Sequence, residues 1–316
     1  MLKKIGKSLR DQAKGAIKDA KLIARSHTDP RFGREELAQG FRGLGLVPGD
    51  AVFVHSSLKS LGYVEGGPIA VFEALWDAIG PDGTMIVPTY YLPGGTIANA
   101  AKDPDYIFDP TVHGSNLGAL PSAFLSFPGV RRSLHPTHSV SVVGQHAEFV
   151  TADHHTAASV FGEGSPWQRF IELGGKLLGV GISMGPVTFY HRLEDEMGDA
   201  FPLPVKRPET HRMRCRDATG AVHDVPVRAF EVEYMHRRID NPARKDVRDY
   251  FWREFSSAGL MHTGAVGAAR CWWIDAQAFH SHLRRLAGEG ITIYASPEDM
   301  DRRGWPALNA DNPPPA

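Results

Sequence analysis

Two short apolar runs separated by a helical pattern constrain the fold of this chain more than any other feature. Residues 51–54 and 84–88 are largely apolar, and each run follows a turn built from Pro, Gly and Asp. Between them, Pro68 opens a helical pattern that ends at Gly80. Strands that are buried on both faces have this composition. The unit therefore predicts an α/β fold with a central, mostly parallel or mixed sheet that helices cover on both faces.

Similar patterns along the rest of the chain predict an α/β/α sandwich. Strands are expected at 140–143 and 174–181, and a hairpin around the turn at 217–220. Residues 92–116 are rich in Gly, Pro, Asp and Asn, which indicates a long loop over the sheet edge. Helices are expected at 34–44, 117–127, 147–152, 246–259 and 276–286.

The chain is expected to divide into three segments: a basic amphipathic helix at 1–30, a single domain at 31–308 with a small C-terminal hairpin and helical subregion, and a flexible tail at 309–316. In the first segment, apolar residues recur at roughly helical spacing among lysines and arginines. This apolar stripe is rich in Ala and lacks aromatic residues. Packing on the protein's own core, or on a second subunit of a homodimer, is therefore favoured over contact with an anionic membrane surface.

Charge, cysteine content and hydropathy exclude several classes of protein. The formal net charge is −1, which argues against nucleic-acid binding because such proteins need a basic face. Neither Cys215 nor Cys271 lies in a CxxC pair, so both are expected to be reduced, structural thiols. No apolar run approaches the ~20 residues of a membrane span, and no secretion signal is recognisable. We therefore expect a cytoplasmic protein without an integral membrane segment.

The polar residues with the clearest chemical potential lie close to the predicted strands. His55 and the two serines after it follow the first apolar run, and ligands of open α/β sheets gather at the carboxyl ends of strands. The segment 133–139 sets imidazoles and hydroxyls around Pro136, which stiffens the backbone. A histidine held on a rigid turn can accept a proton near neutral pH. The HxxH spacing of His135 and His138 is weak evidence by itself.

Several motifs in one order resemble the aminoglycoside 3-N-acetyltransferase family over roughly residues 35–290. The matching elements are residues 55–58, 66–67, 83–84 with 88–89, 132–136 with Ser139, 161–162 with 165–166, Thr188 with His191 and Glu194, and 264–269. The resemblance implies the family fold and transfer of an acetyl group from acetyl-coenzyme A to an amino group, without a metal. The implied acceptor is a small-molecule amine, either an aminoglycoside, as in antibiotic resistance, or another amino sugar.

The resemblance also assigns roles to particular side chains. His135 matches the base that takes a proton from the attacking amine, and Glu194 is the best match for its orienting partner. The residues expected to contact the coenzyme are Ser56, Ser57, Lys59, Arg132 and Ser133. The residues expected to contact the acceptor are Tyr90, His138, His191 and Asp195. The family turn often carries an acidic residue after the proline, whereas this chain has Thr137. This departure either weakens the base, moves its acidic partner to Glu194, or marks a branch whose acceptor is not an aminoglycoside antibiotic.

Some of these residues also fit ordinary structural roles. Ser56 and Ser57 suit the N-cap of a helix, and an isolated base such as Lys59 usually solvates its surface. His138 equally fits a structural hydrogen bond. The acidic run at 194–199 suits a solvated helix face as well as a site that attracts a polyamine.

Two other functions compete with the transferase. The first is a metal-dependent hydrolase, in which imidazoles bind zinc or iron, with His135, His138, His154 and His155 as candidate ligands. The second is a non-catalytic protein that binds coenzyme A. For the transferase itself, the balanced net charge favours an acceptor less cationic than an aminoglycoside, such as an amino sugar or a nucleotide-linked amino sugar.

Overall fold

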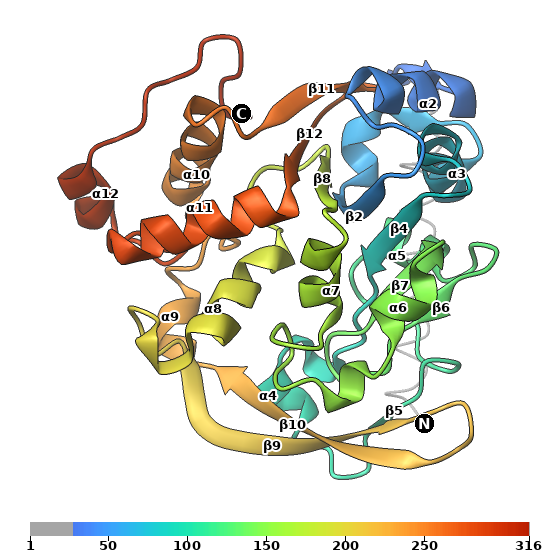
Figure 1. The fold of residues 1–316 in the computed structure, drawn as a ribbon, viewed down its shortest axis with the longest axis vertical. Helices are drawn as coiled ribbons and strands as arrows, with labels where there is room; N and C mark the ends of the chain where they lie inside the picture. Colours follow the sequence, from blue (N-terminus) through green and yellow to red (C-terminus); the bar gives the residue numbers. More distant parts are fainter. Residues whose placement is uncertain (1–27, 316) are drawn as a thin grey trace, which may run out of the picture.

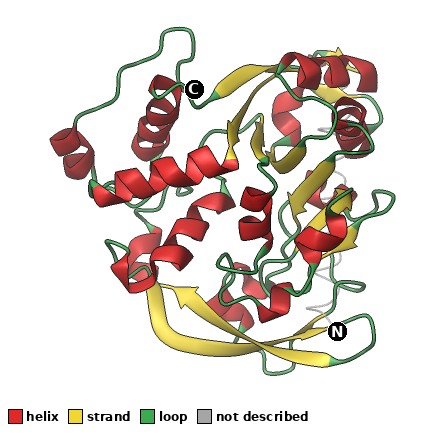
Figure 2. Cartoon of the chain, in the orientation of Figure 1, coloured by secondary structure: helices red, strands yellow, loops and turns green. Residues whose placement is uncertain are grey.

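The computed structural model describes residues 28–315 and shows helices packed on both faces of a central sheet (Figures 1 and 2). Most of the helix predicted at 1–30 lies outside the described residues. None of the described helices is both long and apolar enough to span a membrane. Cys215 and Cys271 are buried and unpaired, as predicted.

The central sheet has seven strands in the order β11-β12-β8-β2-β4-β7-β6. Its middle strands are parallel: β2 (Ala51–Ser56), β4 (Thr84–Pro88) and β8 (Lys176–Val180). The outer strands are antiparallel to their neighbours: β7 (Val140–Gly144), β6 (Arg131–Arg132), β12 (Ala269–Asp275) and β11 (His262–Val266). The prediction of a mixed sheet is therefore confirmed. The carboxyl ends of the three middle strands open on one edge, where ligands of such sheets gather.

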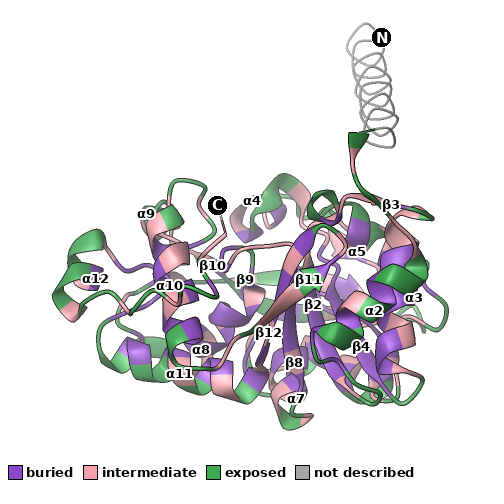
Figure 3. Ribbon diagram, turned by 90° about the horizontal axis from the view of Figure 1, so that it is seen from above, coloured by how far each residue is buried: buried purple, intermediate pink, exposed green. Residues whose placement is uncertain are grey.

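Helices cover both faces because successive strand residues point to opposite sides of the sheet. Val52 and Val54 pack with the helices of one face, whereas Phe53 packs with the aromatic side chains of the other. The first face carries α2 (Arg34–Gly43), α3 (Gly67–Ile79) and α5 (Ala119–Phe124). The second carries α7 (Pro166–Glu172), α8 (His191–Met197), α10 (Lys245–Ser257) and α11 (Ala276–Gly288). Figure 3 shows the buried residues concentrated between these layers.

A second, three-stranded sheet lies apart from the first, along the lower edge of the molecule in Figure 1. Its hairpin consists of β9 (Lys206–Arg216) and β10 (Val222–Phe230), which flank the predicted turn at 217–220. Its third strand, β5 (Ile107–Phe108), comes from the segment 92–116 and pairs parallel with β9. That segment also contains the short helix α4 (Ile97–Ala100), so it is more ordered than the predicted loop.

The smaller elements complete the domain. They are the paired strands β1 (Arg31–Phe32) and β3 (Tyr63–Val64), with the helices α6 (Ala147–Thr151), α9 (Val232–Met235) and α12 (Pro297–Arg303). The predicted flexible tail packs against α10 as far as it is described, because Nε1 of Trp252 donates to the carbonyl of Asn312 at 3.0 Å.

One glycine shows how tightly the central sheet is packed. Gly179 of β8 lies opposite Trp272 of β12, and a Cβ at this glycine would lie 2.1 Å from the indole ring. The indole instead fills this space, and its Nε1 donates to the carbonyl of Ile182 at 2.9 Å. The glycine therefore permits close approach of a bulky neighbour within a strand.

Candidate active site

Two cavities meet at His191, the first residue of α8. One, of about 400 Å³, is lined by the carboxyl ends of β2 and β4, and we call it the strand-end cavity. The other, of about 460 Å³, is lined by Ala229 and Phe230 of the hairpin, and we call it the hairpin cavity. The residues that line both are Leu117, Thr188, His191, Arg238 and Asp240. A side chain shared by two cavities can contact a ligand in each.

His191 and Glu194 form a hydrogen-bonded pair on α8. Residues three apart are neighbours on a helix surface, and Nδ1 of His191 lies 2.9 Å from Oε2 of Glu194. The hydroxyl of Tyr294 donates to Oε1 of Glu194, also at 2.9 Å. The carboxylate side chain is 1% exposed, so both of its oxygens are engaged by protein groups in the interior.

The carboxylate of Glu194 is held in its ionised form. Burial alone raises the pKa of Glu194, but the charge and hydrogen bond of His191, the charge of Lys206 and the hydroxyl of Tyr294 together lower it below its ordinary value. Tyr294 remains a donor because burial raises the pKa of its hydroxyl well above the usual range. A charged carboxylate on one ring nitrogen fixes the orientation of an imidazole and favours proton uptake at the other nitrogen.

A second histidine, His55, holds Thr188 in place, three residues before His191. The backbone N–H of Thr188 donates to Nε2 of His55 at 3.1 Å, and the Thr188 hydroxyl lies 3.0 Å from the same nitrogen. Nε2 therefore acts as an acceptor, and the ring proton resides on Nδ1. Burial lowers the pKa of His55 to about 3, so the ring is neutral at physiological pH. His55 thus anchors Thr188, which lines both cavities.

His135 lies in the protein interior and lines neither cavity. It is 2% exposed, and its Nδ1 accepts from the backbone N–H groups of His138 at 3.1 Å and of Thr137 at 3.3 Å. Its ring stacks on His154 with centroids 4.5 Å apart. Burial and the neighbouring imidazoles lower the pKa of His135 well below the usual value. The hydrogen bonds of His135 therefore stabilise its own turn. Glu194, which was expected to orient His135, pairs with His191 instead.

Arg132 and Ser133, expected to contact the coenzyme, are engaged within the protein. The guanidinium of Arg132 donates to the backbone carbonyls of Thr89 and Gly114, which ties the segment 92–116 to the sheet. Oγ of Ser133 accepts the backbone N–H of Val140 at 2.9 Å, and the residue is fully buried. Neither residue lines the strand-end or the hairpin cavity, and these contacts support a structural role for both.

The three remaining residues expected to contact the coenzyme lie at the end of β2. Ser56 lines the strand-end cavity. The backbone N–H of Ser57 donates to the carbonyl of Val180 at 2.9 Å, so it is not available to a thioester oxygen. Ser57 precedes the 3₁₀ helix η1 (Leu58–Leu61), but its side chain makes no capping hydrogen bond. Lys59 is exposed on η1.

Three of the four residues expected to contact the acceptor come together in the hairpin cavity. Tyr90, His138 and His191 line it, and the rings of Tyr90 and His138 lie 4.6 Å apart. Burial, reinforced by nearby cationic groups, lowers the pKa of His138 well below the usual value, so this imidazole is neutral. Nδ1 of His138 lies 2.7 Å from the hydroxyl of Thr137, so the residue is both hydrogen-bonded and at the cavity.

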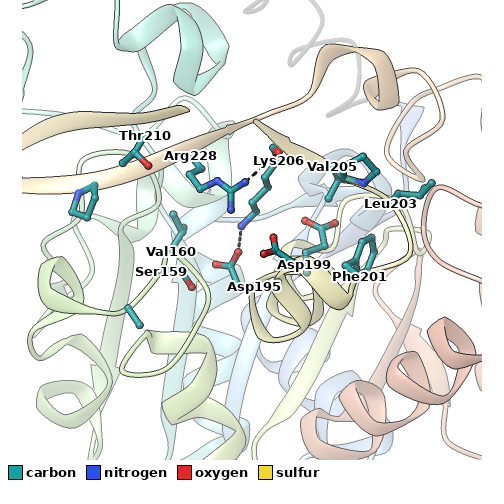
Figure 4. Close-up of a pocket in the computed structure, with 15 residues that line it drawn as sticks. Ser159, Val160, Asp195, Asp199, Phe201, Leu203, Val205, Lys206, Thr210 and Arg228 are labelled. Carbon is teal, nitrogen blue, oxygen red and sulfur yellow. Dashed lines mark hydrogen bonds and ion pairs between the residues drawn. The ribbon is translucent and has the colours of Figure 1, made fainter. Parts of the chain in front are cut away.

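Asp195, the fourth residue, belongs to a different cavity. This cavity, of about 440 Å³, is lined by Asp195, Asp199, Lys206 and Arg228, and we call it the Lys206 cavity (Figure 4). The ammonium of Lys206 forms an ion pair with Asp195, and burial lowers the pKa of Lys206 to about 8. His191 does not line this cavity. Asp195 and His191, both expected to contact the acceptor, therefore line different cavities.

Three residues at the site were missed in the sequence. Tyr294 lies between α11 and α12, far along the chain from Glu194, and no motif marks it. Arg238 and Asp240 follow α9, where Nε and Nη2 of the guanidinium each lie 2.6 Å from a carboxylate oxygen. The sequence offers one signal for the central pair of the site. His191 and Glu194 are three residues apart, a spacing that predicts neighbouring side chains on a helix.

Comparison with known proteins agrees with this fold. The family model for aminoglycoside 3-N-acetyltransferases matches residues 53–287. Aminoglycoside N(3)-acetyltransferase III of Salmonella sp is 32% identical over 254 residues, covering 77% of this chain and 87% of that protein. Aminoglycoside N(3)-acetyltransferase VII of Streptomyces paromomycinus is 30% identical over 255 residues, covering 75% and 84%.

Solved structures of the same kind superpose on this chain. Aminoglycoside acetyltransferase AAC(3)-Xa has a TM-score of 0.69 at 28% identity, with 86% of this chain and 98% of that chain covered. AAC-IIIb in a binary complex with CoASH has a TM-score of 0.65 at 28% identity, with 80% and 94% covered. AAC-VIa bound to sisomicin has a TM-score of 0.65 at 26% identity, with 80% and 96% covered. The chain therefore belongs to the aminoglycoside 3-N-acetyltransferase family of acyltransferases.

Proposed function

We propose that this protein transfers the acetyl group of acetyl-coenzyme A to an amino group of an aminoglycoside or other amino sugar, with His191 as the general base. Family membership supports the reaction class, and the relatives with CoASH or sisomicin bound support the two kinds of ligand. The observation that carries the proposal is that His191 lines both cavities while a buried carboxylate binds its Nδ1. His191 takes the role that the sequence resemblance assigned to His135.

The two cavities suit the two substrates. We assign acetyl-coenzyme A to the strand-end cavity, because Ser56 lines it at the end of β2 and the cationic Lys59 follows on η1. We assign the amine to the hairpin cavity, which Tyr90 and His138 line. In this arrangement the thioester carbon and the amine nitrogen meet beside His191, which reduces the entropic cost of their encounter.

The transfer step requires one proton acceptor. The lone pair of the amine attacks the thioester carbonyl, and the nitrogen passes a proton to Nε2 of His191, because Nδ1 is engaged by Glu194. The tetrahedral intermediate then expels the thiol of coenzyme A, so that a C–N bond replaces the C–S bond. The proton on His191 goes to the leaving thiolate, which returns the base to its starting form. Glu194 stabilises the imidazolium that exists between these steps.

The competing hydrolase finds no support in the arrangement of side chains. Among residues 28–315, no group of three or more His, Cys, Asp or Glu side chains is placed to hold a metal ion. Of its candidate ligands, His135 and His154 stack on each other, and Nδ1 of His154 lies 3.0 Å from the hydroxyl of Ser133.

Thiol release from acetyl-coenzyme A in the presence of aminoglycosides and amino sugars tests the proposal. We expect turnover by the wild-type protein and a loss of about 10²–10⁴-fold in kcat for His191→Asn, which removes the base. The melting temperature of the variant is measured alongside, because His191 is also a hydrogen-bond partner of the buried Glu194, and kcat is given per folded molecule. Absence of thiol release with every amine, or full activity of His191→Asn, would contradict the proposal.

A further inference from the structure

The imidazole of His191 packs against two aromatic rings. Its ring centroid lies 4.8 Å from that of Phe230 and 5.3 Å from that of Phe161. Phe230 ends β10, and Phe161 belongs to the segment between α6 and α7. Glu194 holds one edge of the same imidazole through its hydrogen bond to Nδ1. The orientation of the imidazole therefore depends on the positions of both rings as well as on the carboxylate.

A single ammonium group contacts both of these rings. Nζ of Lys206 lies 5.7 Å from the ring centroid of Phe230 and 5.9 Å from that of Phe161. A cation at such a distance from an aromatic ring is attracted to its face. The contact with Phe230 follows from the register of the hairpin, because Lys206 opens β9 directly opposite Phe230. Arg238 also lies over Phe230, at 5.4 Å, but among the residues that the structure describes only Lys206 lies over both rings.

The same ammonium group is joined to the helix that carries His191. It forms an ion pair with Asp195 of α8, and Figure 4 shows the two side chains directed at each other. Oδ2 of Asp195 accepts the backbone N–H of Phe161 at 2.8 Å. The carboxylate is 1% exposed, so these contacts lie in the interior. Asp195 and Lys206 thus connect α8, the hairpin and the segment that contains Phe161.

Lys206 also acts on the partner of His191 through its charge. Burial raises the pKa of Glu194, and the charge of Lys206 is one of the influences that lower it below its ordinary value. Lys206 itself lines neither the strand-end cavity nor the hairpin cavity, and Asp195 occupies its ammonium group. Any effect of Lys206 on the reaction is therefore exerted through the groups around His191.

We propose that Lys206 is a positioning residue for the general base. Its ion pair and its contacts with the two rings hold the imidazole of His191 in the orientation that proton transfer requires. A displacement of about 1 Å in an active site can lower the rate by about 10²-fold, so a loss of these contacts has a measurable effect. The inference rests on the proposed acetyl transfer with His191 as its base.

Two substitutions of Lys206 test the inference in thiol release from acetyl-coenzyme A with sisomicin, the amine bound in a solved relative. Lys206→Met removes the charge, whereas Lys206→Arg keeps it. We expect kcat per folded molecule to fall about tenfold in Lys206→Met and to recover most of this loss in Lys206→Arg. KM for acetyl-coenzyme A should change less than about twofold, because neither ring lines the strand-end cavity. An unchanged kcat in Lys206→Met, or equal losses in both variants, would overturn the inference.

Lys176 supplies a matched control. Its ammonium pairs with Asp50 at 2.7 Å and lies 4.6 Å from the ring centroid of Trp273. It opens β8, at the end opposite to Val180, which pairs with Ser56 at the strand-end cavity. Both Met variants should have lower melting temperatures, but Lys176→Met should keep the wild-type kcat per folded molecule. An equal loss of kcat in the two Met variants would overturn the inference.

A readout without turnover separates a failure of the inference from a failure of the proposed transfer. Carbon-13 NMR of glutamate-labelled protein follows the titration of Glu194. We expect its pKa to rise in Lys206→Met and to stay at the wild-type value in Lys176→Met, because a nearby cation favours the ionised carboxylate. No thiol release by the wild type with any amine would refute the transfer, and the titration would still decide whether Lys206 acts on the His191–Glu194 pair. An unshifted pKa in Lys206→Met would overturn the inference.

Discussion

At the scale of single residues, the surroundings of an imidazole decide whether it can exchange protons with a ligand. His191 lines two cavities and binds an ionised carboxylate, whereas His135 is enclosed and uses its Nδ1 as an acceptor for two backbone N–H groups. A buried neutral histidine of this kind contributes to stability through its hydrogen bonds rather than through proton transfer. Substitutions at the two positions should therefore have opposite consequences.

We predict that His135→Ala lowers the free energy of unfolding by about 2–4 kcal/mol, because it opens a space in the core and leaves two backbone N–H groups without an acceptor. His135→Asn should recover part of this loss, since its side-chain oxygen can replace Nδ1 as the acceptor. Urea unfolding followed by circular dichroism measures the stability, and thiol release per folded molecule measures kcat. A large loss of kcat in a fully folded His135→Asn variant would restore His135 as the candidate base.

The hydroxyl of Tyr294 donates to Glu194, the hydrogen-bond partner of His191. Its hydrogen bond helps to lower the pKa of Glu194, and its ring packs beside that of Tyr234, with centroids 6.5 Å apart. We predict that Tyr294→Phe raises the pKa of Glu194, moves the acidic limb of the kcat profile to higher pH and lowers kcat by about tenfold. Both KM values should change little, because the hydroxyl contacts neither cavity directly.

The matched control for this prediction is Tyr234→Phe, which removes a hydroxyl from the neighbouring ring without touching Glu194. Its pH profile should coincide with that of the wild type. Carbon-13 NMR of glutamate-labelled protein reports the pKa of Glu194 without any need for turnover, with Glu194→Gln used for assignment. An unshifted acidic limb and an unshifted Glu194 resonance in Tyr294→Phe would show that the hydroxyl has no positioning role.

At the scale of secondary-structure elements, local signals located the buried strands and the capped helices but not the short edge strands. The strand β4 falls at 84–88 as predicted, because a Pro-Asp-Gly turn precedes it and its residues are apolar. By contrast, β11 contains exposed and partly exposed residues, including Gly264, and lies at the edge of the described sheet beside β12. Its partner β12 begins only three residues later, at Ala269, so the two strands form a hairpin, but the exposed residues and the glycine of β11 break the apolar alternation that would mark a strand.

The helix α12 is attached to the rest of the domain by charge. The guanidinium of Arg303 contacts Glu254 of α10 and Glu289, and Glu254 is buried beside His282 at 3.0 Å. We predict that Arg303→Met lowers the free energy of unfolding by about 1–3 kcal/mol, because Glu254 loses one of its partners in the interior. Arg302→Met is the control from the same helix, since that side chain is 77% exposed and should have little effect.

The pH dependence of stability checks the same interaction. Burial raises the pKa of Glu254, but hydrogen bonds from His282 and Arg303 outweigh it, so the pKa lies below the ordinary 4.5. The stabilisation is therefore fully present above that ordinary value and is lost as the pH falls through the folded-state pKa. Chemical unfolding at a series of pH values should show a smaller loss on acidification for Arg303→Met than for the wild type. Parallel curves would contradict the role given to Arg303.

At the scale of the whole molecule, the site is assembled from segments that no sequence window brings together. His55 follows the first strand, His191 opens α8, and Tyr294 lies near the C-terminus. The sequence identified the strand ends, because each depends on neighbours in the chain, and it placed His191 and Glu194 in one motif, but it paired Glu194 with His135. It could not show that one histidine turn is buried and another is open to two cavities, because burial depends on which distant segments pack over each turn.

The proposed reaction, with two cavities meeting at His191, also predicts the kinetic order. Neither cavity is lined by a cysteine, and both Cys215 and Cys271 are buried, so no thiol is placed to carry the acetyl group between half-reactions. In the proposed reaction both substrates are bound together when the amine attacks the thioester beside His191. We predict a sequential mechanism, with intersecting lines in double-reciprocal plots when acetyl-coenzyme A is varied at several amine concentrations. Parallel lines, together with an acetylated protein in mass spectra after incubation with acetyl-coenzyme A alone, would show instead that a side chain carries the acetyl group.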